Sequence, residues 1–269
     1  MPIQRLPEAC DHPIQLCSWT ATDLDRLAEI IAWLLLGRYA HVEAILSGGA
    51  APAPALSNQN IDEAIGHLTC PNRTRIDEHN NEVPSNCVVH RDGWLFQFMS
   101  WVVSQSEFPG SLLKAPQARK ADKGFDGLLL QLNDSALEFV LMLEDKATDD
   151  PRKTVRDKIW PEFKTFEEGL RDNELTAEAT TMLKQVPNLD PAEITRTANW
   201  FREKRYRASV AASESNLPAE VHTFEGYDGV VNGAFDRRLA NLFISDNMRD
   251  FFEDLAQRAI TSLEAKRPD

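Results

Sequence analysis

The stretch GFDGLLLQLNDSALEFVLMLEDKA, residues 124–147, is the part of the sequence that most strongly indicates the fold. Two nearly continuous apolar runs flank a turn at 133–136, a pattern typical of a buried β-hairpin. Because the two strands of a hairpin run in opposite directions, the start of the first lies beside the end of the second. The hairpin therefore gathers charged residues at one edge, namely Asp126, Glu144, Asp145 and Lys146.

The charges at this edge point to a divalent cation. Successive side chains of a strand face opposite sides, so Glu144 and Lys146 share one side and Asp145 faces the other. With Asp126 they place two carboxylates and one ammonium together, and partly desolvated carboxylates repel each other unless a cation lies between them. Mg²⁺, or Mn²⁺ in its place, prefers oxygen ligands and keeps several waters. The sequence therefore predicts metal-assisted hydrolysis of a phosphodiester, with Lys146 orienting the water or stabilising charge on the phosphate.

The order of these motifs resembles a known superfamily. A helix, a strand that begins with Asp126, a strand that ends in Glu144-x-Lys146 and further helices resemble the PD-(D/E)xK superfamily of restriction-endonuclease-like nucleases. The lead-in KGFDG, residues 123–127, matches the Gly-aromatic-Asp form frequent in that superfamily. The resemblance implies that Asp126 and Glu144 are metal ligands, that the backbone carbonyl of Asp145 is a third ligand, and that Lys146 is the catalytic base or charge stabiliser.

The chain departs from the superfamily in the helix before the hairpin. Residues 93–105, GWLFQFMSWVVSQ, predict this helix, with Asp92 as its cap. The superfamily often has a Glu there, whereas this chain has Gln97. Gln97 is therefore a candidate catalytic residue that contacts the metal or its water. The alternative is that Gln97 only forms a hydrogen bond within a buried helix.

The remaining pattern predicts an α/β fold. The resemblance covers residues 92–245 and implies a restriction-endonuclease-like mixed sheet flanked by helices, which we place in a domain at 91–269. Within this domain the patterns predict helices at 150–170, 176–186, 190–204 and after Asp246, and strands at 206–215 and 237–245. Residues 1–90 predict a helical N-terminal region, with helices at 23–46 and 61–68 and a flexible connection at 47–60.

The charge balance bears on the substrate. A net charge of -13 ordinarily argues against DNA binding, because Lys and Arg must neutralise phosphates. Two basic runs, 114–124 and 196–207, depart from this average, although solvated surface is the alternative for both. The residues in them that we expect to contact DNA are Lys114, Arg119, Lys120, Lys123, Arg202, Lys204 and Arg205. In the helix after the hairpin, Lys153, Arg156 and Lys158 can reach a scissile phosphate, although we expect at least two of them on solvated surface.

A second resemblance bears on the biological setting. In size, in its lead-in and in the position of its Glu-x-Lys, the chain is loosely similar to the nuclease subunit of the Hachiman antiphage system. This implies a deoxyribonuclease in bacterial antiphage defence or DNA processing that depends on a helicase or ATPase partner to deliver DNA. The alternative is a catalytically inactive nuclease fold that serves as a scaffold or binding subunit.

Cysteine and histidine residues leave a zinc site open as a lesser alternative. The four cysteines, Cys10, Cys17, Cys70 and Cys87, are few for 269 residues, so we expect thiols or metal ligands rather than a disulfide scaffold. HLTC (67–70) and CVVH (87–90) place two imidazoles and two thiols on either side of a polar loop, a donor set that suits structural Zn²⁺.

Other features of the sequence indicate the cellular location and the oligomeric state. No stretch approaches the roughly 18 apolar residues of a membrane helix, and the first residues lack a signal-peptide core, so we expect a cytoplasmic protein that does not bind membranes. The pair Phe251-Phe252 can bury against its own core or a second copy, so a homo-oligomer stays open. Trp94, Trp101, Trp160 and Trp200 are expected in the core rather than in base stacking.

Overall fold

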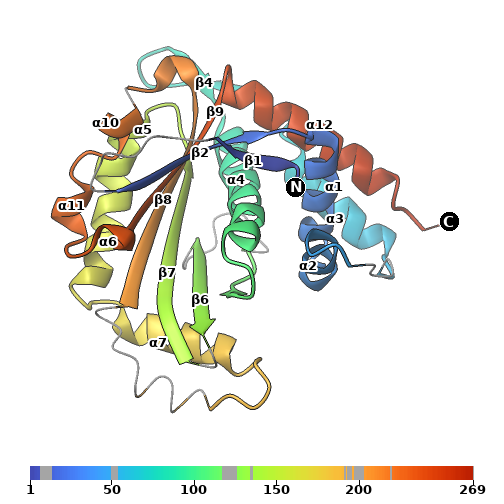
Figure 1. Ribbon diagram of the computed structural model, residues 1–269. Helices are drawn as coiled ribbons and strands as arrows, with labels where there is room; N and C mark the ends of the chain where they lie inside the picture. Colours follow the sequence, from blue (N-terminus) through green and yellow to red (C-terminus); the bar gives the residue numbers. More distant parts are fainter. Residues whose placement is uncertain are drawn as a thin grey trace.

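A curled mixed sheet forms the centre of the molecule (Figure 1). The computed structural model describes residues 1–6, 14–49, 54–116, 126–133, 136–190, 192, 196, 203–218 and 220–268. In this part of the chain seven strands pair in the order β1-β2-β9-β8-β7-β6-β5. Their bounds are β1 Ile3–Leu6, β2 Gln15–Ala21, β5 Leu112–Leu113, β6 Gly127–Asn133, β7 Ala136–Ala147, β8 Lys204–Ser213 and β9 Arg238–Ser245. The four strands β2, β9, β8 and β7 run parallel to one another. β1 pairs antiparallel with β2, β6 with β7, and β5 with β6, so the predicted mixed α/β class is confirmed.

The hairpin predicted at residues 124–147 is formed by β6 and β7. They pair antiparallel with Gly127 opposite Leu143 and Asn133 opposite Ala136, so the predicted hairpin is confirmed. β7 also pairs with β8, which places the hairpin inside the sheet, and its middle residues are buried on both faces because helices cover each side. Parallel pairing of β7 with β8 needs a crossover connection, and the helices after β7 supply it.

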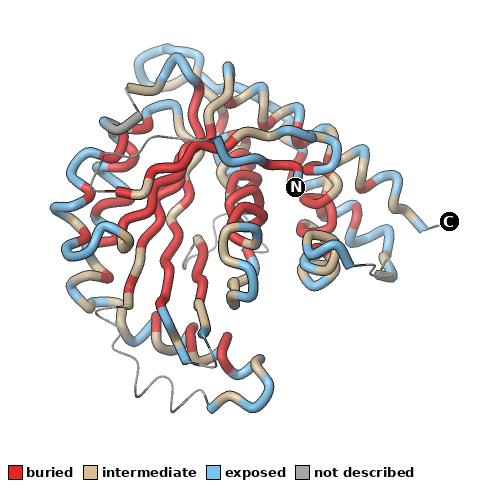
Figure 2. Tube along the Cα trace, viewed as in Figure 1, coloured by how far each residue is buried: buried red, intermediate tan, exposed pale blue. Residues whose placement is uncertain are grey.

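Helices cover both faces of the sheet. One face packs against α1 Leu24–Leu35, α2 Tyr39–Leu46, α3 Asn58–Leu68, α4 Asn86–Glu107 and α12 Met248–Glu264. The other packs against α5 Pro151–Thr154, a π-helical turn at Val155–Ile159, α6 Trp160–Glu167, α7 Asp172–Leu183, α10 Glu220–Thr223 and α11 Tyr227–Val230. Figure 2 shows the strands buried between these layers. A small hairpin of β3 Thr74–Ile76 and β4 Glu82–Pro84 lies outside the sheet, and no described helix is long and apolar enough to cross a membrane.

The N-terminal part differs from the expected helical region at 1–90. β1 and β2 extend the central sheet, and the expected boundary at residue 90 falls inside α4. Both strands are short, so their periodicity is weak in the sequence. Within the expected connection at 47–60, α3 already begins at Asn58 after a Ser57 cap. The expected helix at 190–204 lies mostly outside the described residues, and its last residue, Lys204, begins β8 instead.

Most of the aromatic residues singled out in the sequence lie in the core. Trp94, Trp101 and Trp160 are buried, as predicted, whereas Trp200 lies outside the described residues. Phe252 is buried in the protein's own core and Phe251 is partly buried against Phe243. The structure therefore gives the pair an intramolecular place, and the homo-oligomer stays a prediction.

Asp92 connects α4 to α12 rather than capping a helix. α4 begins at Asn86 with Ser85 as its cap, so the expected cap role of Asp92 is wrong. The earlier start was missed because residues 86–91 are polar except for the Cys-Val-Val run. The Asp92 carboxylate is fully buried and accepts hydrogen bonds from Arg91 and from Arg249, at 2.7–3.1 Å.

We expect Asp92→Ala to lower the free energy of unfolding by about 3 kcal/mol, because it leaves two largely buried guanidinium groups short of a partner. Urea denaturation measures this loss. The control is Asp250→Ala, which removes the exposed partner of Arg73 on α12 and should cost less than about 1 kcal/mol. Equal losses in the two variants would contradict a structural role for the buried pair.

Candidate active site

Asp126, Glu144 and Lys146 meet at the open end of the β6–β7 hairpin. The Lys146 ammonium donates to Asp126 Oδ2 at 2.8 Å and lies 2.6 Å from Glu144 Oε1. Glu144 and Lys146 share a face of β7, and Asp126 directly precedes the Gly127 that pairs with Leu143. The structure thus brings together the three side chains that the sequence singled out.

A close approach of the two strands holds Asp126 in place. A Cβ added at Gly127 would lie 2.8 Å from Leu143 Cδ1 and 3.1 Å from Leu143 Cβ, closer than ordinary contacts. A larger residue here would force the Leu143 side chain to move, so glycine suits this position, and it is the residue that follows Asp126 in the KGFDG motif.

The helix α4 approaches the same carboxylate from the other side. Gln97 Nε2 donates to Asp126 Oδ1 at 2.9 Å, and the backbone N–H of Asp145 donates to Asp126 Oδ2 at 3.3 Å. Gln97 therefore orients Asp126, which is more than a hydrogen bond within its own helix. With Lys146 on Oδ2, the carboxylate has donors on both oxygens.

The Asp145 side chain faces away from this cluster into a buried polar network. Its Oδ1 accepts from Ser100 Oγ at 2.7 Å, and Arg207 Nη2 donates to the same hydroxyl at 2.8 Å. Arg207 also donates to Ser104 Oγ at 2.6 Å and Glu107 Oε2 at 3.0 Å. The Asp145 carboxylate is therefore engaged in this network. Only its backbone carbonyl is left to bind a metal ion, which is the role that the resemblance implies.

This network involves a row of polar residues on α4, of which the sequence analysis singled out only Gln97. Gln97, Ser100, Ser104 and Glu107 follow one another at spacings of three and four along α4, so they lie on one face of the helix. The row was visible as a polar stripe within an apolar helix. The residues that it contacts on β7 and β8 are distant in sequence, so the sequence could not show what this polar row binds.

Burial shifts the acid–base behaviour of the cluster. Burial first, and then the neighbouring Asp126, raises the pKa of Glu144 to about 8 against the opposing effect of Lys146. Burial lowers the pKa of Lys146, but the charges of Glu144 and Asp126 outweigh it, so this pKa lies above its ordinary value. Lys146 therefore stays an ammonium at neutral pH and suits charge stabilisation better than proton abstraction. Burial also raises the pKa of Asp145 to about 6, against the effect of Arg207.

The cluster opens onto a cleft of about 490 Å³. One wall is the N-terminal half of α4, the other is α5 with the π-helical turn, and the loop after β7 lies between them. Asp126 and Lys146 line the cleft, whereas Glu144 is not among the lining residues and keeps 14 % of its side chain exposed. This volume admits a nucleotide-sized group.

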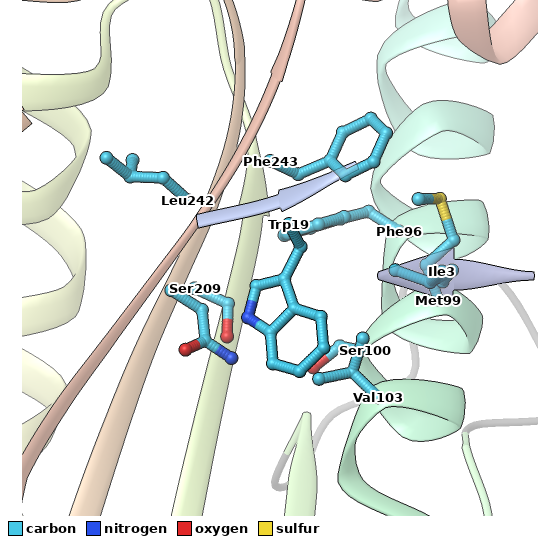
Figure 3. A pocket seen from close by; sticks show the side chains of 10 residues that line it. Ile3, Trp19, Phe96, Met99, Ser100, Val103, Ser209, Leu242 and Phe243 are labelled. Carbon is cyan, nitrogen blue, oxygen red and sulfur yellow. The ribbon is translucent and has the colours of Figure 1, made fainter. Parts of the chain in front are cut away.

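A second cavity behind the network is too small for a substrate. It has a volume of about 20 Å³, the size of a single water, and lies between Trp19 of β2, Ser209 of β8 and α4 (Figure 3). Ser100, which holds Asp145, lines it from α4. A hollow of about 710 Å³ between α6 and α11 is larger than the cleft but contains none of the three cluster residues. The cleft lined by Asp126 and Lys146 is therefore the candidate substrate site.

The described basic residues that were expected to contact DNA form contacts within the protein instead. Lys204 is fully buried and donates to the Phe166 carbonyl at 2.9 Å and to Asp172 at 2.6 Å, so its expected role at a DNA surface is wrong. The reason is that β8 is an inner strand rather than part of an exposed helix. Lys114 forms an ion pair with Glu178, and Arg205 pairs with Asp236 while lying over the Phe139 ring. The other expected contacts, Arg119, Lys120, Lys123 and Arg202, lie outside the described residues.

Two of the cysteines form a disulfide instead of the expected thiols, whereas Cys17 is a buried thiol as expected and Cys10 lies outside the described residues. Cys70 and Cys87 are joined in a disulfide with their Cα atoms 5.7 Å apart, and it ties the end of α3 to the first turn of α4. His67 packs its ring edge near Trp94, and His90 is exposed at the cleft. The two sulfurs thus have each other as partners in place of zinc. Over the described ranges, no three or more His, Cys, Asp or Glu side chains are placed to share one metal ion.

We expect Glu144→Gln to stabilise the protein at alkaline pH. The folded protein keeps the Glu144 proton up to about pH 8, whereas the unfolded chain loses it near the ordinary value of 4.5. The folded state therefore binds more protons between these values, and its free energy of unfolding falls as the pH rises through them. Glutamine removes this fall, so the variant should exceed wild type by about 1–3 kcal/mol at pH 8.

Chemical denaturation at pH 4 and pH 8 measures this difference, which should nearly vanish at pH 4. Glu138→Gln, an exposed change on the same strand, is the matched control and should behave as wild type at both values. A Glu144→Gln variant that loses stability equally at both pH values would contradict the raised pKa.

Comparison with known proteins adds no family name to this geometry. No family model matches the chain, and no curated protein matches its sequence. The function is therefore inferred from the contacts within the site.

Proposed function

We propose that this protein is a metal-dependent nuclease that hydrolyses DNA phosphodiester bonds at Asp126, Glu144 and Lys146. The observation that carries the proposal is the Lys146 ammonium within 2.8 Å of two carboxylates, at the end of a buried hairpin that opens onto a cleft. A desolvated cluster of this kind, with a strongly raised pKa at Glu144, is typical of functional sites. The order of α4, the β6–β7 hairpin and the following helices is also the order on which the superfamily resemblance rests.

The donor set fits magnesium or manganese. Asp126 and Glu144 supply two carboxylates and Asp145 a backbone carbonyl, and Mg²⁺ is commonly held by one or two carboxylates together with substrate oxygens and water. The side chains brought together include no thiol or imidazole that would favour zinc. When bound, the ion would polarise a phosphoryl oxygen and lower the pKa of a water.

The residues of the chain have separate tasks in this proposal. Lys146 stays protonated and stabilises the charge that develops on the phosphate. Gln97 orients Asp126 through Oδ1, while Asp145 fixes the end of β7 to α4 through Ser100. Together they hold the reacting groups on a strand and a helix rather than on a loop, which keeps their geometry defined.

The charge of the chain favours a partner that delivers DNA. Within the two expected basic runs, Lys114, Lys204, Arg205 and Arg207 have acidic partners within the fold. They add little to the attraction of DNA by a chain of net charge -13. We therefore include a helicase or ATPase partner in the proposal, within bacterial antiphage defence or DNA processing.

A catalytically inactive scaffold is the second candidate. The observation that favours it is that Lys146 already lies between both carboxylates, so the cluster has a counter-charge without a metal. Calorimetric titration with Mn²⁺ separates the two. The nuclease should bind Mn²⁺ with an affinity that Asp126→Asn and Glu144→Gln each weaken, whereas a scaffold should show no such binding.

We expect Glu144→Gln and Lys146→Met each to reduce cleavage of DNA by at least about 100-fold, because the first removes a metal ligand and the second removes the ammonium that stabilises charge on the reacting phosphate. The assay follows plasmid and linear single- and double-stranded DNA with Mg²⁺ or Mn²⁺. Lys164→Met is the matched control, since Lys164 belongs to a second Glu-x-Lys triplet on the exposed side of α6 and should be dispensable.

The assay is repeated with a candidate helicase or ATPase if wild type alone does not cut. Cleavage that survives both active-site substitutions would contradict the assignment of these residues. Circular dichroism confirms that each variant remains folded.

A further inference from the structure

The cleft has four basic side chains on its walls, and two of them are already engaged. They are His90, Lys146, Lys158 and Arg249. Lys146 lies between Asp126 and Glu144, and Arg249 donates to Asp92 and Asp149 at 2.7 and 2.6 Å. Arg249 is compensated within the protein and Lys146 belongs to the proposed reacting cluster, so neither supplies a separate charge for a second phosphate.

Lys158 differs from these residues. It is exposed, it lines the cleft, and among the described residues its side chain has neither an ion pair nor a hydrogen bond. The neighbouring Arg156 pairs with Asp157 at 2.6 Å, and Arg152 donates to the Glu225 carbonyl at 2.7 Å. Of the basic residues in this segment, Lys158 is thus the one that combines an uncompensated charge with a place at the cleft.

The backbone around Lys158 supports a functional role. Residues Val155–Ile159 form a π-helical turn, in which the N–H of Trp160 donates to the Val155 carbonyl five residues earlier. Such turns interrupt α-helices rarely and are frequent at functional sites. Here Val155 and Ile159 stay buried in the core while Thr154 and Lys158 line the cleft.

We propose that Lys158 binds a backbone phosphate of the nucleic acid that flanks the scissile phosphate. The inference rests on the proposed nuclease function and deepens it. Lys158 stands on the α5 side of the cleft, whereas Gln97 and His90 stand on the α4 side and Lys146 ends β7. A strand that places one phosphate at Lys146 passes between these walls, and the Lys158 ammonium neutralises the next phosphate as a point charge.

The test compares Lys158→Ala, Lys158→Glu and Lys158→Arg with Lys153→Ala. Lys153 belongs to the same helical segment and is exposed, but it does not line the cleft, so it is a matched control. Fluorescence anisotropy measures binding of a labelled single-stranded DNA of about 12 nucleotides in EDTA, where no cleavage occurs. The salt concentration is varied from about 50 to about 200 mM.

Lys158→Ala should weaken binding about 3- to 10-fold at low salt and reduce the slope of log affinity against log salt by about 0.7, the value for one phosphate contact on a single strand. Lys158→Glu should weaken it further, Lys158→Arg should restore it, and Lys153→Ala should match wild type. The inference is overturned if Lys158→Glu binds as wild type, if Lys153→Ala is as weak as Lys158→Ala, or if wild type shows no salt-dependent binding.

Cleavage kinetics separate this inference from the proposed function. With Mg²⁺, Lys158→Ala should raise KM and leave kcat nearly unchanged, because a flanking phosphate is held equally in the ground and transition states. If wild type does not cut even with a candidate helicase or ATPase present, the proposed function fails and the binding comparison still tests Lys158. If wild type cuts and all Lys158 variants bind as wild type does, only the flanking site is overturned.

Discussion

The pairing of β7 with a strand on each side is the constraint on which the rest of the structure depends. Antiparallel β6 brings Asp126 beside Glu144 and Lys146, and parallel β8 brings Arg207 next to the end of the same strand. Between the neighbouring strands and the helices on both faces, Asp145 is buried and Glu144 and Lys146 are only partly exposed, so these charged side chains find partners within the protein. They do so in two groups on opposite faces of the strand, because successive residues alternate.

The two groups differ in how well their charges are compensated. On the α4 side, Asp145 and Arg207 share the Ser100 hydroxyl and Arg207 also reaches Glu107, so hydrogen bonds connect two buried groups of opposite charge. On the cleft side, one ammonium faces two carboxylates, and burial raises the pKa of Glu144. The first group stabilises the strand end, whereas the second is costly for stability and is the kind of strained arrangement that function maintains.

The distribution of positive charge follows from the same topology. Lys204 and Arg207 belong to β8, and an inner strand places both among helices that cover the sheet. Their charges stabilise the fold through Asp172 and Glu107 and do not reach the solvent. A cleft with carboxylates at its Asp126 and Lys146 end suits a cation before a phosphate, in line with the metal-dependent function proposed for it.

The sequence by itself determined the hairpin, the neighbourhood of Asp126 with Lys146, and the mixed α/β class. Alternation along a strand and the reversal of a hairpin are local rules, and they place these side chains without knowledge of anything distant. Only the tertiary structure decided that Gln97 orients Asp126, that Lys204 is buried, and that Cys70 bonds Cys87. Each of these depends on which distant element packs against a face, and periodicity shows that a face is buried without showing what covers it.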